Sequence, residues 1–440
     1  MKEARLGKTY AVVDRVVIAY LFRNYDEIQV NRMLMMLIMP FAACQPYVPD
    51  SGQPMPPEMF MGRKEDLLAV ESPEGVNIVY GGRQLGKSAL LKMAQNDIDH
   101  DEAGDRAILI DLHDCKSTGA AALAVSQELT DLRFFKAGQG VETEDWSELA
   151  RAITQRLRDP VDRIPYFLLM LDEADAFIEQ CAAENYAPFD ALKRVQQNGS
   201  AQFKFVIAGL HNIVRFSKAA LGENSVLAHL THCTVKPFRV SEARELLETP
   251  LRYLGFRFPE NASSLIALIL AHANYFPGLI QLYCKELIRA LAKEDYAHYD
   301  ETKTPPYEIT RDHVRAVLTN RAFQEQVREK FMITLRLDSD KYYYIIAYLL
   351  ASLYHKAGSR GFTPAEIAHE ASAYDFEQFR TLSRERLTAF LDELTELNVL
   401  RGNAEGRYFF NRYSFFQMLG SRDDVEEKLY ALALGEEDLA

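Results

Sequence analysis

The stretch Gly81-Gly82-Arg83-Gln84-Leu85-Gly86-Lys87-Ser88 decides the fold class of this chain. It fits the pattern G-x-x-x-x-G-K-[S/T], a loop whose backbone N–H groups surround a phosphate. The apolar run 76–80 before it is typical of a buried strand, and residues 89–94 are typical of the first turns of a helix. The alternative, a glycine turn with a chance lysine, would not need these two neighbours. The stretch therefore predicts binding of a nucleoside triphosphate.

Each part of this loop has an expected task. The N-terminus of the following helix adds its partial positive charge. Lys87 is expected to reach the β- and γ-phosphates and to assist catalysis, and Ser88 is expected to bind Mg²⁺. The predicted cofactors are ATP or ADP with Mg²⁺. The expected cofactor-binding residues of this segment are Gly81, Gly82, Arg83, Gln84, Leu85, Gly86, Lys87, Ser88 and Ala89.

Two carboxylates, Asp172 and Glu173, end the apolar run 165–171, which is typical of a third strand. Asp172 is expected to hold Mg²⁺ through water, and Glu173 to polarise the attacking water as a general base. An acidic strand end that faces solvent is the alternative, but a phosphate loop in the same chain favours the catalytic pair. The additional strand expected at 107–112 fits the class of ATPase in which this glutamate is catalytic.

Polar residues follow the fourth expected strand, residues 203–208. His211 or Asn212 is placed to hold the γ-phosphate or the attacking water; the alternative is a loop residue that satisfies local backbone groups. Arg215 is a candidate arginine finger toward a neighbouring subunit. A solvated or ion-paired surface arginine is the alternative for that position.

Composition sets limits on the class of protein. The 440 residues are enough for two or three domains. The net charge of −13 disfavours broad, sequence-independent binding to nucleic acid, although it allows a local basic surface. The five cysteines show no zinc-binding spacing and indicate reduced thiols. The apolar stretch 33–39 ends at Pro40, far short of a membrane span, so a cytoplasmic protein without membrane contact is expected.

Composition shifts along the chain predict four parts. Apolar strands separated by helices predict an α/β domain with a parallel sheet, and the later segments are helical. Three helices followed by a hairpin form the pattern of a winged helix. The parts are an N-terminal helical segment with a proline-rich linker (1–57), the α/β domain (58–236), a helical lid (237–330), and a winged-helix domain with a C-terminal helix (331–440).

In the order of these motifs the chain resembles the prokaryotic STAND and origin-recognition-like AAA+ ATPases. The resemblance rests on the phosphate loop and on further segments: 60–65, 171–175, 208–211, 224–230, 235–238 with the helix that contains 242–243, and 275–281. It implies a P-loop NTPase of the ASCE or AAA+-like type with a helical lid and a C-terminal winged helix. It also implies that Arg63 lies near the base and ribose, and that Pro277 begins a lid helix over the nucleotide.

The chain departs from this family pattern at two places. His272, Asn274 and Tyr275 stand where relatives have an arginine at the start of the second lid helix, so a lid arginine on the γ-phosphate is not expected. The winged-helix region has no Met-His-Asp motif, and His355 stands in an unrelated context. Sensing of ADP by a histidine is therefore not carried over to this chain.

The resemblance implies an ATP-hydrolysing regulatory switch, slow in turnover, that works with a protein partner or effector chain in a signalling or defence assembly. A homo-oligomer is possible. The alternative is a DNA-binding loader or regulator in replication, transposition or anti-phage DNA sensing. Arginines near the start of the expected helix 383–397 favour DNA, namely Arg380, Arg384 and Arg386, and the wing offers Arg401, Arg407 and Arg412 as candidate phosphate contacts. Acidic residues on the same helix weaken this argument, namely Glu385, Asp392, Glu393 and Glu396. A scaffold that binds ATP without turnover is the third hypothesis.

Overall fold

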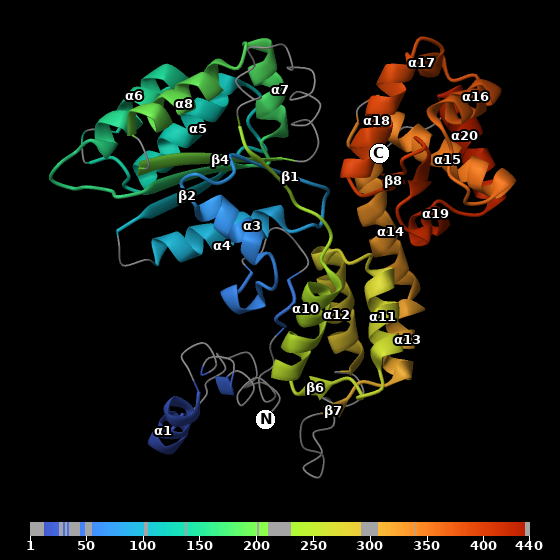
Figure 1. The fold of residues 1–440 in the computed structure, drawn as a ribbon, viewed down its shortest axis with the longest axis horizontal. Helices are drawn as coiled ribbons and strands as arrows, with labels where there is room; N and C mark the ends of the chain where they lie inside the picture. The colour runs from blue at the N-terminus through green and yellow to red at the C-terminus, as the bar shows by residue number, and fades with distance from the viewer. Residues whose placement is uncertain are drawn as a thin grey trace, which may run out of the picture. The chain divides into compact units, whose positions relative to one another are not determined.

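The computed structural model describes residues 13–25, 30, 33–34, 45–48, 55–100, 104–136, 138, 140–199, 202–209, 230–291, 307–338 and 340–435 (Figure 1). The chain divides into two compact units. The first comprises Met1–Gly62 with Pro237–Val327, and the second comprises Arg63–Lys236 with Arg328–Ala440. The predicted boundaries at 57, 236 and 330 stay predictions.

A five-stranded parallel sheet, in the order β2-β3-β4-β1-β5, forms the centre of the second unit. The parallel sheet expected from the apolar runs is confirmed, and four strands lie where the sequence predicted them. β5 was not predicted, because its three residues form no apolar run; pairing with β1 defines it. The strands are β1 (Ile78–Tyr80), β2 (Arg106–Asp111), β3 (Phe167–Asp172), β4 (Phe203–Gly209) and β5 (His232–Thr234).

Helices cover both faces of this sheet (Figure 1). One face packs in a single core against α5 (Thr118–Asp131), α6 (Trp146–Leu157), α7 (Asp175–Ala183) and α8 (Ala187–Gly199). Alternate residues of β3 and β4 supply that core, as the two-residue period of a strand requires. The helices α3 (Lys64–Glu71) and α4 (Lys87–Asp99) lie on the other face.

A buried lysine on β4 caps the C-terminal end of α3. The ammonium of Lys204 donates hydrogen bonds to the carbonyls of Ala69, Val70 and Ser72, at 2.9, 2.6 and 2.6 Å. The last carbonyls of a helix have no partner within the helix. The three donors of one ammonium therefore satisfy the end of α3, which fixes this helix on the sheet.

The carboxyl group of Glu71, the last residue of α3, should make stability depend on pH. Burial, and next the charge of Asp97, raise its pKa to about 7 from an ordinary 4.5. Between pH 4.5 and about 7 the folded chain keeps a proton that the unfolded chain loses, so the free energy of unfolding should fall as pH rises through this range. The expected decrease is about 1 kcal/mol, because the side chain is only half-buried and solvent screens it.

Urea unfolding of Glu71→Gln between pH 5 and 8 tests this expectation. The amide stays neutral, so the variant should lose most of the decline that the wild type shows. Glu74→Gln, an exposed position three residues further on, is the matched control and should keep the decline. If the free energy of unfolding falls equally with pH in wild type and in Glu71→Gln, another group is responsible for the decline.

The C-terminal part of the second unit contains three helices and a hairpin in the predicted order. α15 (Tyr342–Ala357) is buried along most of its length, and α16 (Pro364–Tyr374) and α18 (Arg384–Glu396) pack against it. The strands β8 (Leu400–Gly402) and β9 (Tyr408–Phe410) are antiparallel, and Phe362 bridges Tyr408 as a third strand position. The remaining helices are α17 (Glu377–Arg380), α19 (Tyr413–Met418) and α20 (Arg422–Leu434).

The first unit is mainly helical, as expected for a lid. Tyr47 and Val48 fasten the N-terminal segment to it: the Tyr47 hydroxyl donates to the Leu247 carbonyl at 3.1 Å, and the Val48 N–H donates to Gln281 at 2.9 Å. The elements are α1 (Arg15–Asn24), η3 (Pro57–Met59), α10 (Val240–Tyr253), β6 (Phe256–Arg257), α11 (Ser263–His272), α12 (Pro277–Leu291), β7 (Tyr307–Glu308), α13 (Arg311–Leu318) and α14 (Arg321–Leu335), the last of which continues into the second unit.

Within the described ranges, every single helix is too short or too polar to cross a membrane. Only α11 and α12 together meet the length and hydropathy criteria, and they are bent by 119° at their break.

Candidate nucleotide-binding site

The sheet topology brings the predicted motifs together. β4 lies between β1 and β3 and pairs in parallel with both. The carboxyl ends of parallel strands meet at one edge of a sheet, where α/β proteins bind ligands. The phosphate loop after β1 and the carboxylates at the end of β3 therefore share an edge, and the end of β4 lies between them.

Backbone geometry explains the glycines of the loop. Gly81 has φ +155°, and a Cβ there would lie 2.5 Å from the carbonyl oxygen of Val235. Gly86 has φ +87° and precedes the first turn of α4, which has no side-chain cap. The uncapped N–H groups of that turn are free to receive an anion. Gln84 also adopts the left-handed region, with φ 63°.

Lys87 is buried under the loop. Its ammonium donates to the carbonyls of Gly81 and Gly82, at 2.8 and 3.2 Å. Burial lowers the pKa of Lys87, while the carboxylates of Glu173 and Asp172 oppose that shift. A cation held by loop carbonyls, beside carboxylates at the same sheet edge, fits a phosphate chain.

The carboxylate pair is held in a strained turn. Asp172 is buried and accepts a hydrogen bond from the N–H of Glu173 at 2.9 Å, and Glu173 has φ 49°. Ala174 then ties the turn to β4 through the carbonyl of Ala208 at 2.9 Å. Burial, and next the charge of Asp172, raise the pKa of Glu173. Left-handed backbone at a non-glycine residue marks functional sites, and a raised pKa suits a general base.

Arg63 stabilises the backbone of the phosphate loop. Its guanidinium donates to the carbonyls of Leu85 and Lys236, both at 2.7 Å, and to the carboxylate of Asp66 at 3.1 Å. The side chain is buried, with a left-handed backbone of φ 54°. The structure thus places Arg63 on loop carbonyls, as a positioning residue. Its expected place near the base and ribose stays a prediction.

The remaining predicted site residues lie in the α/β domain, in the other unit, or outside the described part of the chain. Ser88 and Ala89 lie half-buried in the first turn of α4, and Arg83 is exposed on the loop. Pro277 is the buried first residue of α12, in the other unit, and its contact with nucleotide stays a prediction. Three predicted residues lie outside the described part of the chain: His211, Asn212 and Arg215.

The predicted Mg²⁺ site requires only Ser88 and Asp172 from the protein, since Mg²⁺ keeps several waters and takes phosphate oxygens. Within the described ranges, no three His, Cys, Asp or Glu residues form a metal-binding group by themselves. The donors that are present, a hydroxyl and a carboxylate, are hard oxygen ligands of the kind that Mg²⁺ prefers.

Two contributors to this region were missed by the sequence reasoning. Asp175, the first residue of α7, adds its charge to those that act on Lys87 and Glu173. Its place in the run Leu171-Asp172-Glu173-Ala174-Asp175 was a signal for this. Asp66 forms an ion pair with Arg63 and orients it. The two residues are three positions apart at the start of a helix, a spacing that could have predicted this pair.

Solved structures provide the comparison with known proteins. The Walker-type ATPase PABY2304 of Pyrococcus abyssi is 16% identical, with 82% of this chain and 96% of that chain covered and a TM-score of 0.54. The Aeropyrum pernix ORC2 protein, in ADPNP-ADP complexes, is 12% identical, with 84% and 95% covered and a TM-score of 0.53. No protein-family model and no curated protein matches the sequence. The chain therefore has the α/β fold of a P-loop NTPase, which it shares with these two proteins over most of its length.

Proposed function

We propose that this protein is an ATP-hydrolysing AAA+ ATPase that binds duplex DNA through a winged helix. The observation that carries the ATPase part is the meeting, at one sheet edge, of the uncapped N-terminus of α4, the buried ammonium of Lys87 and the strained pair Asp172 and Glu173. The likeness to a Walker-type ATPase and to ORC2 in nucleotide complexes supports the same conclusion.

The residues divide the work of hydrolysis among them. N–H groups of the loop and of the first turn of α4 bind the β-phosphate, and Lys87 moves its ammonium from the carbonyls of Gly81 and Gly82 to the phosphates. Ser88 and Asp172 would hold Mg²⁺, which when bound would neutralise phosphate charge. Glu173 orients the attacking water and takes its proton. Arg63 keeps the loop backbone in the shape that binding requires.

The DNA-binding part depends on which way the carboxylates of α18 face. Glu393 is buried and accepts a hydrogen bond from the hydroxyl of Tyr343, and Asp392 accepts one from the hydroxyl of Tyr408 at 2.8 Å. Two of the acidic residues that argued against DNA binding are thus hydrogen-bonded to tyrosines of the same domain. The exposed start of α18 carries Arg384 and Arg386 with Glu385 as the acid between them, which leaves a positive surface for phosphates.

The hairpin carries an exposed arginine as a further candidate for phosphate contact. Arg401 on β8 is exposed and lies over the ring of Phe409, 5.1 Å from its centroid. Arg407, by contrast, is paired with Glu366 and donates to the carbonyl of Gly361. Arg380 is paired with Asp375. The likeness to an ORC2 protein supports a DNA-binding loader or regulator better than it supports a signalling assembly.

The double variant Arg384→Glu/Arg386→Glu should bind a duplex of about 30 base pairs roughly tenfold more weakly than the wild type at low salt, because two phosphate contacts become repulsive. The slope of log affinity against log salt should fall by about 2. Fluorescence anisotropy measures both quantities.

The double variant Lys92→Glu/Arg163→Glu is the matched control for that measurement. It changes the net charge by the same amount at exposed positions of the α/β domain and should leave the affinity unchanged. Wild-type protein without salt-dependent affinity for DNA would refute the DNA-binding part. The regulatory switch that acts through protein partners would then be the role left to test.

A further inference from the structure

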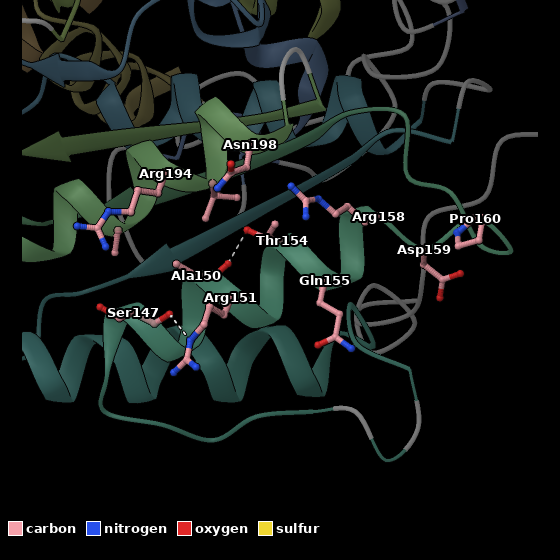
Figure 2. A pocket seen from close by; sticks show the side chains of 12 residues that line it. Ser147, Ala150, Arg151, Thr154, Gln155, Arg158, Asp159, Pro160, Arg194 and Asn198 are labelled. Atoms are coloured by element: carbon pink, nitrogen blue, oxygen red, sulfur yellow. Dashed lines mark hydrogen bonds between the residues drawn. The ribbon is translucent and has the colours of Figure 1, made fainter.

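A groove of about 850 Å³ runs between α6, α8 and the loop after α6, on the outer side of the α/β domain (Figure 2). Small side chains line it, namely Ala150 from α6 and Ala191 and Val195 from α8. Arginines lie beside them: Arg151 is on α6, Arg158 directly follows α6, and Arg194 is on α8. None of these residues belongs to the nucleotide site.

The groove is positively charged in a chain whose net charge is −13. Its three arginines are exposed, and in the described part of the chain none of them forms an ion pair. The one lining carboxylate, Asp159, is paired with Lys136, which with the N–H of Val161 lowers its pKa to about 2. The groove is therefore suited to an anionic partner.

Spacing and composition favour a helix as that partner. Arg151 and Arg158 are seven residues apart, which is about 10.5 Å along a helix axis. Arginines spread along one side of a groove in this way suit a partner that carries its carboxylates along one side of a helix. Small residues between the arginines allow close approach of such a helix. The residues that line the groove include no aromatic ring for stacking bases, which disfavours single-stranded nucleic acid.

The last described helix of the chain presents a face with the complementary properties. On α20, Val425, Leu429 and Leu432 are buried inside the domain. The opposite side carries four exposed residues at helical spacing, acidic at the start and apolar at the end: Asp423, Glu427, Tyr430 and Leu434. Tyr430 is 58% exposed and Leu434 is 69% exposed. In the sequence, Glu436, Glu437 and Asp438 follow.

We propose that this face of α20 in one copy of the chain docks in the arginine-lined groove of a second copy. Asp423 and Glu427 then pair with the groove arginines, while Tyr430 and Leu434 cover the small apolar residues between α6 and α8. Asp423 and Glu427 are four residues apart, so both carboxylates lie on the same exposed side of α20. The contact joins two different surfaces, so it is heterologous. It depends neither on nucleotide nor on DNA.

Sedimentation equilibrium of the full chain without nucleotide tests the proposal. The wild type should self-associate, more weakly at high salt because the pairs lie at the rim of the contact. The groove variant Arg151→Glu/Arg158→Glu/Arg194→Glu and the helix variant Asp423→Lys/Glu427→Lys should each weaken self-association by at least about tenfold. An equimolar mixture of the two should associate again, because each copy keeps one intact surface. The chain with all five changes should also regain self-association if the charges pair directly.

A charge-matched control shows whether the position of the changes matters as well as their charge. Lys92→Glu/Lys116→Glu/Arg163→Glu changes the charge equally outside the groove and should associate as the wild type does. Circular dichroism checks folding, and the milder Arg→Gln changes replace any variant that fails it. A wild type that stays monomeric at about 100 μM overturns the proposal. So does a groove variant that loses affinity for duplex DNA while its self-association is unchanged, which would assign the groove to nucleic acid.

Discussion

Lys87→Ala should weaken binding of ATP and ADP by at least about a hundredfold, because it removes the only buried ammonium that the loop holds next to the phosphate position within the described residues. Hydrogen bonds from a charged group contribute about 1.5–3 kcal/mol each, and a hundredfold loss corresponds to about 2.7 kcal/mol. The variant also leaves the carbonyls of Gly81 and Gly82 without their donor. Isothermal titration calorimetry at constant salt measures the loss directly.

Lys92→Ala is the control for that experiment, since Lys92 lies five residues further along the same helix and is exposed. It should bind nucleotide as the wild type does. Thermal unfolding supplies a second readout: a ligand that binds only the folded state raises its stability, so ADP should raise the Tm of wild type and of Lys92→Ala but not of Lys87→Ala. An unchanged Kd for Lys87→Ala would remove the main support for the nucleotide site.

The sequence predicted the elements of the site because each has a local signal. The loop has its glycines and lysine, and β3 and β4 are mainly apolar, so four of the five strands could be placed. Burial on both faces of a parallel sheet produces such runs. The order of the strands was not given by these patterns, and the position of β4 between β1 and β3 is what brings loop and carboxylates to one edge.

Long-range contacts of polar side chains could not be predicted. The place of Arg63 near the base and ribose stays a prediction, but its hydrogen bonds to carbonyls 22 and 173 residues away were not predicted. Lys204 interrupts an apolar strand in the sequence, and only the packing of α3 on β4 shows why it is there. On α18, a helix pattern cannot tell that Asp392 and Glu393 have hydroxyl partners on other elements. In each case the partner is distant in sequence, so no pattern of residue spacing predicts the contact.

Glu173→Gln should slow ATP hydrolysis by at least about a hundredfold and leave ATP binding nearly unchanged. A positioned general base contributes roughly 10²–10⁴ to a rate, and glutamine keeps the size of the side chain while losing the basic oxygen. The left-handed backbone at this position and the bond from its N–H to Asp172 do not depend on the side-chain charge. Release of phosphate under saturating ATP measures turnover, and calorimetry measures binding.

The pH profile distinguishes a base from a residue that only shapes the site. Burial raises the pKa of Glu173, so the wild-type rate should fall as pH drops through that raised value, because a protonated carboxyl group takes no proton from water. Glu173→Gln has no such group, and its residual rate should lack this acid limb. A variant with the same limb as the wild type would assign the titration to another residue.

Glu179→Gln is the matched control, because Glu179 is exposed on the adjoining α7 and should hydrolyse ATP at the wild-type rate. The two outcomes that would contradict the assignment differ in meaning. Unchanged turnover in Glu173→Gln would show that water is activated elsewhere. Loss of ATP binding would show that the carboxylate supports the loop through the charge it places near Lys87. Slow turnover with retained binding is expected only if the strained turn after β3 aims this carboxylate at the attacking water.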